Sequence, residues 1–440
     1  MMKHIVVLGA GESGVGAALL AKKQGLEVFV SDFGTIADNY KKELSEHGIA
    51  FEEGKHTVEQ LMSCDTVIKS PGIPDKTPVI QQLKEAGKRI ISEIEFGALY
   101  YKGKTIAITG SNGKTTTSGL MYHVLKNARL DIALGGNYGK SFARIVAESQ
   151  PAYMVIEVSS FQLDDVDTFR PDIAVLLNIT PDHLDRYDYA LAKYAEAKFR
   201  IARNQQPEDF FIYNEDDQEI SKMLKVSALR ATCIGIHKDQ YINGIASLDG
   251  QGNFEVSLKG KHNLFNAMCV VAACRKLGLS EREIALGLQS FVNVPHRLES
   301  CGVIAGVEFI NDSKATNVDA VFYGLEAMEK PVVWIAGGTD KGNEYDVLVP
   351  LVREKVNALI CLGVDNEKLK TFFKPYIATI AETTNVSEAV EMGLSFSEQG
   401  DAVLLSPACA SFDLFSNYMD RGDQFKAAVA DLKTSIDNEN

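Results

Sequence analysis

At 440 residues the chain exceeds one ordinary hydrophobic core, so we expect two or three domains. Its composition is that of a globular protein, with 45% apolar and 24% charged residues. The formal net charge of −14 argues against a general binder of nucleic acid or of anionic membranes, because the overall field repels polyanions. It permits a small phosphorylated ligand, which a local loop and a few cations can hold.

The N-terminal residues and the cysteines indicate the cellular compartment in which we expect the protein. Residues 1–9 contain a short apolar stretch that ends in glycines before acidic residues, which favours a strand over a signal peptide. No apolar run approaches the length that spans a bilayer. The seven cysteines form no Cys-x-x-Cys pair, a pattern typical of reduced thiols. We therefore expect a cytoplasmic protein without a membrane segment.

The N-terminal segment alternates strand-like and helix-like stretches, which predicts a parallel α/β sheet. The pattern Gly9-x-Gly11-x-x-Gly14 follows the first strand, and Asp32 ends the second. By itself it is typical of dinucleotide binding, so an NAD-dependent oxidoreductase is one hypothesis. Another nucleotide, or a plain strand–helix turn, is the alternative. We expect strands at 5–8, 27–32 and 66–69, a helix ending near 23, and a turn at 70–74.

A second α/β unit begins near Glu93, and it contains a glycine-rich loop between a strand and a helix. The strand at 105–109 leads into Gly110-Ser111-Asn112-Gly113-Lys114-Thr115-Thr116. N–H groups converge at such a helix start and favour a phosphate; Lys114 can reach its transferable group and Thr115 can ligate Mg²⁺. The spacing is two residues shorter than the common Gly-x-x-x-x-Gly-Lys-Thr loop. A glycine turn with a surface lysine, or a non-catalytic nucleotide-binding module, is therefore the alternative.

Polar residues follow two further strands of this unit, expected at 153–158 and 173–178. Glu157 and His183 lie at these strand ends, and both suit Mg²⁺ directly or through water, although either can be structural. Lys198 lies in a helical stretch, where its position favours a solvated side chain. A lysine amine held neutral can instead add CO₂ and become an anionic carbamate.

The remaining segments repeat the α/β theme. A helix is expected at 261–277, with Asn263 and Asn266 on one face, and a linker at 293–297. Asp312 and Lys314 follow the next strand, and Lys341 lies in a glycine-rich loop. One carboxylate and two lysines suit a ribose and phosphates, although surface charge gives the same pattern. Strands are expected at 307–310, 332–336, 358–362 and 402–405.

Seven ordered motifs together resemble the Mur ligase family. The resemblance covers essentially the whole chain, and the ordered set is far more specific than any single motif. Within the family, the chain resembles the members that add D-glutamate to UDP-N-acetylmuramoyl-L-alanine. The motifs occupy residues 109–116, 157–163, 178–186, 262–266, 295–299, 311–317 and 406–413.

The resemblance implies a three-domain α/β fold. It places an N-terminal Rossmann-like UDP-substrate domain at 1–92, a central ATP-binding parallel sheet of the P-loop type at 93–296, and a C-terminal Rossmann-like domain at 297–440. The implied enzyme is an ADP-forming acid–amino-acid ligase of peptidoglycan precursor synthesis. The substrate carboxylate takes the γ-phosphate of ATP, and the D-glutamate amine attacks the acyl phosphate. ATP and two Mg²⁺ ions are implied as cofactors, and we expect a monomer.

The resemblance also implies roles for single residues of the central domain. Lys114 stabilises the γ-phosphate, and Thr115 ligates Mg²⁺. Glu157 binds one Mg²⁺ ion, while His183 and a carbamylated Lys198 hold the second. The implied ATP contacts are Gly110, Ser111, Asn112, Gly113, Lys114, Thr115, Thr116, Asn266 at the adenine, Arg297 at a phosphate and Asp312 at the ribose.

The other implied contacts belong to the amino acid and the UDP substrate. Lys314 lies near the attacking amine and the acyl phosphate, and an aromatic residue near D-glutamate is expected at Tyr418. The implied D-glutamate residues are Thr316, Lys341, Ser411 and Phe412. The implied UDP-substrate residues are Ser13, Asp32, Gly72 and Asn137.

Two features separate the alternatives within the superfamily. A folylpolyglutamate synthase would share the ATP loop and the lysine carbamate, but the glycine-rich N-terminal segment argues against it. The Asp-Asn-Pro-Arg signature of the diamino-acid-adding members is absent from the sequence. One departure concerns the uridine side, where the family pattern often has an arginine after the acid. Here Phe33 and Gly34 follow Asp32, which suggests that Phe33 packs on the base.

Overall fold

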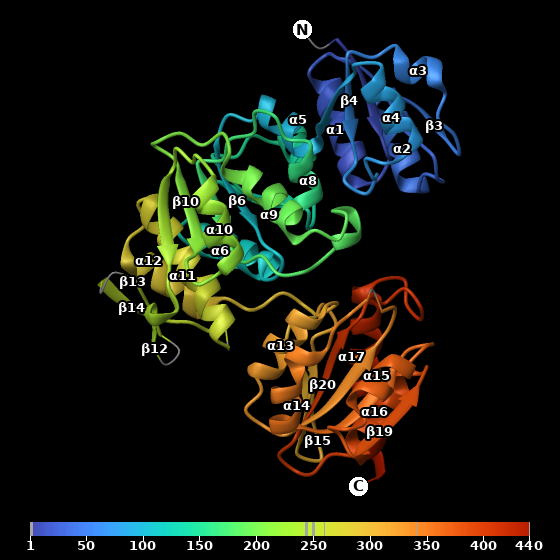
Figure 1. Cartoon of the computed structure of the whole chain (residues 1–440), viewed down its shortest axis with the longest axis vertical. Helices are drawn as coiled ribbons and strands as arrows, with labels where there is room; N and C mark the ends of the chain where they lie inside the picture. The colour runs from blue at the N-terminus through green and yellow to red at the C-terminus, as the bar shows by residue number, and fades with distance from the viewer. Residues whose placement is uncertain (1–2, 243–244, 249–250, 259, 341, 440) are drawn as a thin grey trace. The chain divides into compact units, whose positions relative to one another are not determined.

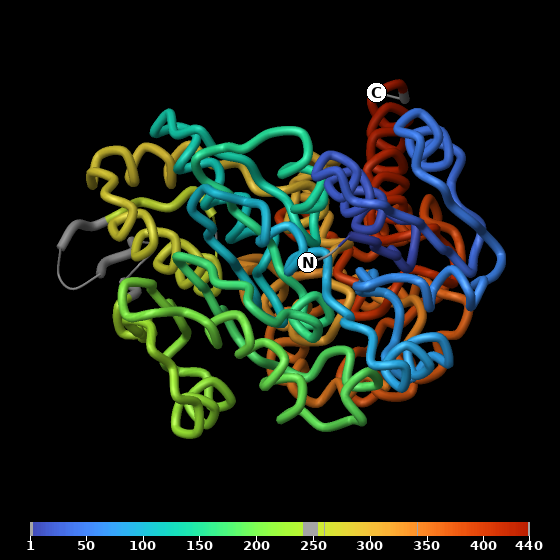
Figure 2. The backbone as a smooth tube through the Cα atoms, turned by 90° about the horizontal axis from the view of Figure 1, so that it is seen from above, coloured from blue at the N-terminus to red at the C-terminus, as the bar shows by residue number. Residues whose placement is uncertain are grey.

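The computed structural model describes residues 3–242, 245–248, 251–258, 260–340 and 342–439. The chain forms two compact units, one from residues 1–257 and 263–291 and the other from 258–262 and 292–440. Figures 1 and 2 trace the path through three large sheets and the helices around them. No helix of the described residues is long and apolar enough to cross a membrane. The predicted α/β class is confirmed.

The N-terminal sheet is entirely parallel, with the strand order β3-β2-β1-β4-β5. Ile5 and Val7 of β1 pack into one buried cluster and Val6 and Leu8 into another, so both faces of the sheet are covered. The strands are β1 His4–Leu8, β2 Glu27–Asp32, β3 Ala50–Glu53, β4 Thr66–Lys69 and β5 Arg89–Ser92. The helices are α1 Glu12–Lys23, α2 Asp38–Glu46, α3 Val58–Met62 and α4 Pro78–Glu85.

The central sheet is also parallel, with the order β11-β10-β9-β6-β8-β7. Its strands are β6 Lys104–Thr109, β7 Ile132–Gly136, β8 Tyr153–Glu157, β9 Ile173–Leu176, β10 Phe210–Asn214 and β11 Thr232–Ile236. Its helices are α5 Glu93–Tyr100, α6 Lys114–Asn127, α7 Phe142–Glu148, α8 Ser160–Asp164, α9 Leu191–Phe199, α10 Gln218–Val226, α11 Lys261–Lys276 and α12 Glu281–Ser290. A small antiparallel sheet contains β12 Tyr241–Ile242, β13 Ile245–Leu248 and β14 Gln251–Glu255.

The C-terminal sheet is mixed, because β15 pairs antiparallel with β16 while the other neighbours are parallel. Its order is β15-β16-β20-β17-β18-β19. The strands are β15 Glu299–Ile304, β16 Val307–Asn311, β17 Val332–Gly337, β18 Val356–Leu362, β19 Thr379–Thr383 and β20 Ala402–Ala408. The helices are α13 Val318–Glu326, α14 Val349–Lys355, α15 Glu367–Phe373, α16 Val386–Ser395 and the long α17 Tyr418–Glu439, red in Figure 2.

The predicted boundaries at 92/93 and 296/297 stay predictions. The first two sheets lie in one compact unit, and residues of α1 and α7 belong to the same buried cluster. The main segment of the second unit begins after Phe291, close to the linker expected at 293–297.

Candidate active site

The phosphate loop connects β6 to α6, as the sequence predicts. Gly110 has φ of 156° and Gly113 has φ of 86°, backbone angles that favour glycine. A Cβ on Gly110 would lie 2.9 Å from Cβ of Leu177, so the loop also passes too close to β9 for a side chain. Asn178 fixes the loop from that side, since its Oδ1 accepts from the N–H of Asn112 at 2.9 Å. The loop is therefore held open around the start of α6.

Lys114 and Lys198 meet at the same carbonyl of this loop. Each Nζ donates to the carbonyl oxygen of Gly110 at 2.8 Å. Lys198 is 1% exposed, and its ammonium nitrogen lies 4.4 Å from the ring centre of Tyr194. Burial, and then the charge of Lys114, lowers the pKa of Lys198 well below its usual range. The interpretation of Lys198 as a solvated lysine is therefore wrong.

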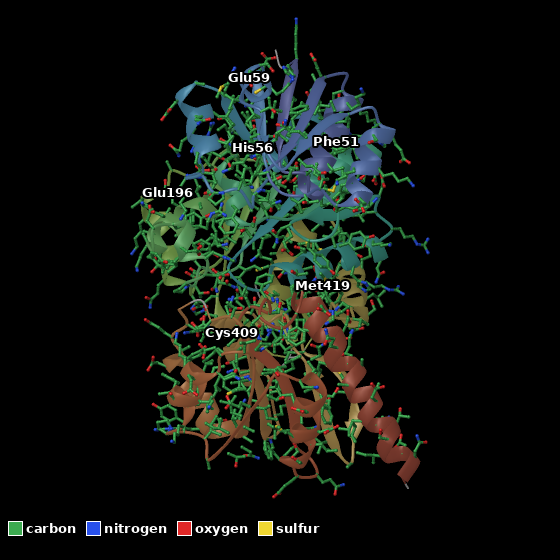
Figure 3. All side chains as sticks on the ribbon, turned by 90° about the vertical axis from the view of Figure 1, so that its right-hand side faces the viewer. Phe51, His56, Glu59, Glu196, Cys409 and Met419 are labelled. Atoms are coloured by element: carbon green, nitrogen blue, oxygen red, sulfur yellow. The ribbon has the colours of Figure 1, made fainter. Side chains whose placement is uncertain are left out.

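The face of α9 on which Lys198 lies explains why its side chain is buried. Glu196 lies two positions before Lys198, about 200° away around the helix. It is exposed and lies at the edge of the view in Figure 3. Lys198, in contrast, donates to the Gly110 carbonyl of the loop. The pattern of apolar and polar residues in a short helix does not predict which helix face packs against a loop.

Glu157 ends β8 and lies beside Asn137, which follows β7. The Nδ2 of Asn137 donates to Oε1 of Glu157 at 2.7 Å, and the Asn137 N–H donates to the Glu157 carbonyl at 2.8 Å. Glu157 is buried, and its Oε2 has no hydrogen-bond partner among the described residues. An orphaned buried carboxylate oxygen fits a cation ligand.

The protein side chains at this place fit Mg²⁺ only if ligands from outside the protein complete its coordination shell. The described residues contain no group of three or more His, Cys, Asp or Glu side chains that could hold a metal. Mg²⁺ usually takes one or two protein carboxylates and completes its shell with phosphates and waters. Glu157, with the buried Thr115 at the loop, suits such a site.

His183 lies on the turn after β9, with a left-handed φ of 51°. Its ring packs edge-on against Phe161, with 5.2 Å between the ring centres. The guanidinium of Arg186 lies over the same Phe161 ring, 4.4 Å from the ring centre. Arg186 also donates to the carbonyls of Pro71, Gly72 and Ile73 at 3.3–3.5 Å. The turn of His183 is thereby joined to the loop of Gly72.

Asn266 of α11 lies against the phosphate loop. A Cβ on Gly113 would come within 3.0 Å of Oδ1 of Asn266. The Nδ2 of Asn266 donates to Oδ1 of Asn263 at 3.3 Å, which confirms that the two asparagines share a helix face. The structure thus brings Asn266 to the loop that the sequence assigns to ATP.

The glycine loop of the N-terminal domain is closed by Asp32. One carboxylate oxygen accepts from the N–H of Ala10 at 2.6 Å and the other from that of Gly34 at 2.7 Å. Ser13, the second residue of α1, is half-buried beside this loop. Phe33 is 73% exposed and lies 5.8 Å from the ring of His56. Asp32 therefore shapes the loop, and Phe33 offers a free aromatic face.

In the C-terminal domain, Asp312 is buried at the end of β16. Its oxygens accept from the Leu298 N–H at 3.3 Å and from the Ser406 hydroxyl at 3.0 Å. Burial raises the pKa of Asp312 to about 6, and the charge of Arg297 opposes that shift. The Nε of Arg297 is buried without a hydrogen-bond partner in the described part of the chain. Arg297 and Asp312, predicted to contact one nucleotide, lie near each other.

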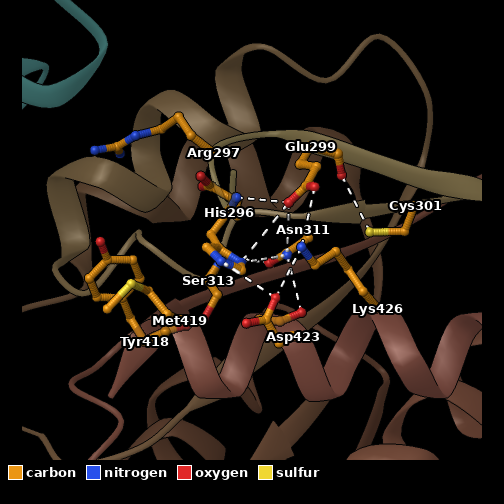
Figure 4. A network of polar contacts seen from close by, with 12 residues as sticks. His296, Arg297, Glu299, Cys301, Asn311, Ser313, Tyr418, Met419, Asp423 and Lys426 are labelled. Atoms are coloured by element: carbon orange, nitrogen blue, oxygen red, sulfur yellow. Dashed lines mark hydrogen bonds and ion pairs between the residues drawn. The ribbon is translucent and has the colours of Figure 1, made fainter. Parts of the chain in front are cut away.

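A polar network supports the turn of Arg297 from below (Figure 4). His296 has a left-handed φ of 64°, and its Nδ1 lies 3.0 Å from Nδ2 of Asn311. The N–H of His296 donates to Glu299 at 2.8 Å, and Lys426 of α17 pairs with Glu299 at 3.4 Å. These bonds hold the turn in its strained conformation.

Lys314 and Tyr418 form the next contact. The Nζ of Lys314 donates to the Tyr418 hydroxyl at 3.1 Å, and the backbone N–H of Lys314 donates to the His296 carbonyl at 3.1 Å. Thr316 follows in the same loop, with its N–H bonded to the Lys314 carbonyl. The aromatic residue expected near D-glutamate thus lies beside Lys314.

The remaining predicted D-glutamate residues differ in exposure. Ser411 is buried after β20, while its neighbour Phe412 is 70% exposed. Lys341 lies outside the described residues, so its assignment stays a prediction.

Arg421 is a residue that the sequence analysis missed. It is 1% exposed at the start of α17, and it donates to Ser313 Oγ at 3.0 Å and to the Ser313 carbonyl at 2.9 Å. It also donates to the carbonyls of Cys409 and Gly337 at 3.3 and 3.4 Å. One guanidinium thus joins three loops at the carboxyl edge of the sheet. An Arg-Gly pair on a charged helix gives no signal of this role.

Comparison with known proteins adds the family. Residues 4–79 match the MurD N-terminal domain, 108–274 the Mur ligase middle domain, and 296–409 the glutamate ligase domain of Mur ligases. A UDP-N-acetylmuramoylalanine–D-glutamate ligase of Christiangramia forsetii is 50% identical over 98% of this chain and 100% of that protein. The chain belongs to the Mur ligase family. A Porphyromonas gingivalis ligase of the same name is 51% identical to this Mur ligase over 97% of the chain and 98% of its own length.

Solved structures share the fold at low identity. UDP-N-acetylmuramate–alanine ligase from Thermotoga maritima has a TM-score of 0.62 at 19% identity, covering 98% of this chain and 100% of its own. A folylpolyglutamate synthase from Mycobacterium tuberculosis has a TM-score of 0.59 at 14% identity, covering 76% and 91%. Both likenesses concern the fold alone. The three-domain α/β architecture predicted for this Mur ligase is confirmed, whereas the roles of its site residues stay predictions.

Proposed function

We propose that this Mur ligase joins D-glutamate to UDP-N-acetylmuramoyl-L-alanine while ATP is converted to ADP and phosphate. The observation that carries the proposal is the end-to-end identity of about half with proteins named for that reaction. The alanine carboxylate attacks the γ-phosphorus of ATP, and ADP leaves. The D-glutamate nitrogen then attacks the acyl carbon, loses a proton, and phosphate leaves with the C–O bond electrons.

The phosphate loop supplies the electrostatics for the first step. The N–H groups at the start of α6 and the Nζ of Lys114 are fixed before ATP arrives, because Gly110 and Asn178 hold the loop. Fixed donors stabilise negative charge on a transferring phosphoryl group without reorganising. Asn266 beside Gly113 suits the adenine end of the same nucleotide.

Lys198 suits the role of a carbamate. Its lowered pKa favours a neutral amine, which is the form that adds CO₂ with release of one proton. The product is an anion beside Lys114, so the repulsion between two ammonium groups becomes an attraction. His183 and this carbamate form the proposed second cation site, and Thr115 and Glu157 form the first. When bound there, Mg²⁺ supplies positive charge to the phosphate oxygens.

The C-terminal residues suit the second step. Lys314, whose Nζ donates to the Tyr418 hydroxyl, suits a cation beside the acyl phosphate and the attacking amine. Thr316, Lys341 and Ser411 suit the carboxylates of D-glutamate, and Phe412 its carbon chain. The seven cysteines are free thiols, which suits a reaction in the cytoplasm.

Phosphate release from ATP, measured with each substrate left out in turn, tests the proposal. Release that needs both UDP-N-acetylmuramoyl-L-alanine and D-glutamate supports it. Release that ignores the amino acid contradicts it. Nicotinamide absorbance tests the oxidoreductase alternative, which accounts for residues 9–32 only; no substrate-dependent change is expected.

A further inference from the structure

An ion cluster around the buried Arg144 joins the glycine loop of the N-terminal domain to the central domain. Arg144 of α7, with a side chain 8% exposed, donates from Nε to Glu12 Oε1 at 2.7 Å. Its two terminal nitrogens donate to both carboxylate oxygens of Glu43 at 2.5 and 3.1 Å. Burial opposes the charge of Arg144, yet the bonds to Glu43 and Glu12 raise its pKa above the usual range. The guanidinium is thus oriented as a fork between two helices.

The partner Glu12 also fixes the start of α7. The same Oε1 accepts from the backbone N–H of Ser141 at 2.9 Å. Ser141 caps α7 through its side chain, which accepts from the N–H of Arg144. Helices α1 and α7 approach so closely that a Cβ on Gly16 would lie 2.0 Å from Ser141 Oγ. Only glycine permits this approach.

The segment that leads into α7 carries Asn137. It is short, and the N–H of Gly136 closes it by donating to the Lys140 carbonyl at 2.9 Å. Asn137 in turn holds Glu157, whose other oxygen lacks a partner among the described residues. A continuous series of bonds therefore runs from Glu12, the residue before Ser13, to Glu157.

We propose that Arg144, together with Glu12 and Glu43, is a positioning device that transmits occupancy of the UDP pocket to Asn137 and Glu157. Glu12 starts the helix that follows the glycine loop, so a ligand that orders this loop also fixes Ser141. The segment 137–141 then keeps Asn137 and Glu157 in place for phosphoryl transfer. This inference rests on the proposed function and on the resemblance to the family, which implies that the N-terminal domain binds the UDP substrate.

Hydrogen exchange with UDP alone tests the coupling without catalysis. In the wild type, UDP is expected to slow exchange at residues 10–14 and at 137–141. In Arg144→Met it should slow exchange at 10–14 only. Protection confined to 10–14 in the wild type overturns the inference and leaves the proposed function intact. Absence of protection anywhere overturns the assignment of UDP to the glycine loop and with it the inference, whereas phosphate release tests the proposed function.

Kinetics supply the second readout. Arg144→Met is expected to lower kcat/KM for UDP-N-acetylmuramoyl-L-alanine on the order of a hundredfold, as displaced reacting groups do, and to leave the KM for D-glutamate within about twofold. Arg144→Lys keeps the charge but not the fork, so it should recover only part of the loss. Arg170→Met is the matched control, since Arg170 also pairs with two carboxylates, Glu208 and Asp209.

Should Arg144→Met fail to fold, Glu43→Gln weakens the same fork from a half-buried position. Its kcat should fall, and its KM should rise for the UDP substrate alone. Equal kinetics for the Arg144 and Arg170 variants, or a KM that rises equally for all three substrates, contradicts the inference.

Discussion

At the scale of single residues, the environment of Lys198 decides its chemistry. The ammonium groups of Lys114 and Lys198 both donate to the Gly110 carbonyl, so their positive charges repel each other. Only Lys198 is fully buried, which adds a desolvation cost to its charged form. Burial therefore lowers the pKa of Lys198, and the charge of Lys114 lowers it further. A fully buried lysine beside a phosphate loop is unusual for structure alone, which fits the carbamate proposed for Lys198.

Lys198→Ala should lower the rate on the order of a hundredfold or more, because one anion of the site is lost. Short-chain carboxylic acids should restore part of the activity by taking the place of the carbamate. Phosphate release with and without added acetate measures both effects. Lys193→Ala, on the exposed side of the same helix, serves as control and should keep its rate. A Lys198→Ala enzyme as fast as this control contradicts the assignment.

Residue roles were predictable where they depend on local sequence. The loop 110–116 is recognisable in the sequence, because its glycines and lysine lie between a predicted strand and a predicted helix. Lys198 does not, because its partner Gly110 lies 88 residues earlier in the chain. Arg421 meets Ser313 across 108 residues for the same reason. Such contacts depend on tertiary packing, which neither spacing nor periodicity contains.

At the scale of elements, most central strands were predictable and the edges were not; β10, which lies between β9 and β11, was missed as well. Strands β1, β6, β8 and β17 are continuous apolar runs buried on both faces. Edge strands such as β3 and β19 are short and mix polar with apolar residues. Their sequences resemble loops, so they were missed.

Arg421→Met should loosen the three loops that hold Ser313, Gly337 and Cys409. Burial lowers the pKa of Arg421 to about 10, so the residue is charged at neutral pH and satisfies several carbonyls at once. Unpaired buried carbonyls cost on the order of 3 kcal/mol of unfolding free energy in total. Denaturant unfolding measures this loss, with exposed Gln424→Met as control. Equal midpoints for the two variants would show that the bonds of Arg421 contribute little.

Helix α5 begins with a buried acid that makes stability depend on pH. Glu93 Oε1 accepts from the Ala143 N–H, and Oε2 has no partner in the described structure. Burial raises the pKa of Glu93 to about 8, the Ala143 bond opposes the shift, and the negative charge of Glu12 adds to it. Arg144 is already engaged by Glu12 and Glu43. The folded state therefore holds a proton that the unfolded state releases near pH 4.5.

This contribution to stability is complete below about pH 4.5 and is lost as pH rises to about 8. The slope is up to about 1.4 kcal/mol per pH unit in that window. Glu93→Gln, which stays neutral, should flatten the decline of the melting temperature between these limits. Glu59→Gln, an exposed acid of α3 labelled in Figure 3, should leave the profile unchanged. Parallel profiles for wild type and Glu93→Gln would refute a buried neutral acid.

At the scale of the whole molecule, the residues assigned to ATP belong to both compact units. The loop 110–116 and Asn266 lie in one, and Arg297 and Asp312 lie in the other. The UDP-substrate residues and the phosphate loop lie within a single unit. The described residues predicted to bind D-glutamate lie in the other unit.

The most direct test of the central claim is a panel of amino acids offered with UDP-N-acetylmuramoyl-L-alanine and ATP. Phosphate release and product mass are read for each, with L-glutamate, L-alanine and a diamino acid beside D-glutamate. We predict one amide product, formed with D-glutamate, and one phosphate released per amide bond. A preferred amine other than D-glutamate, or phosphate release without an amide product, would contradict the account.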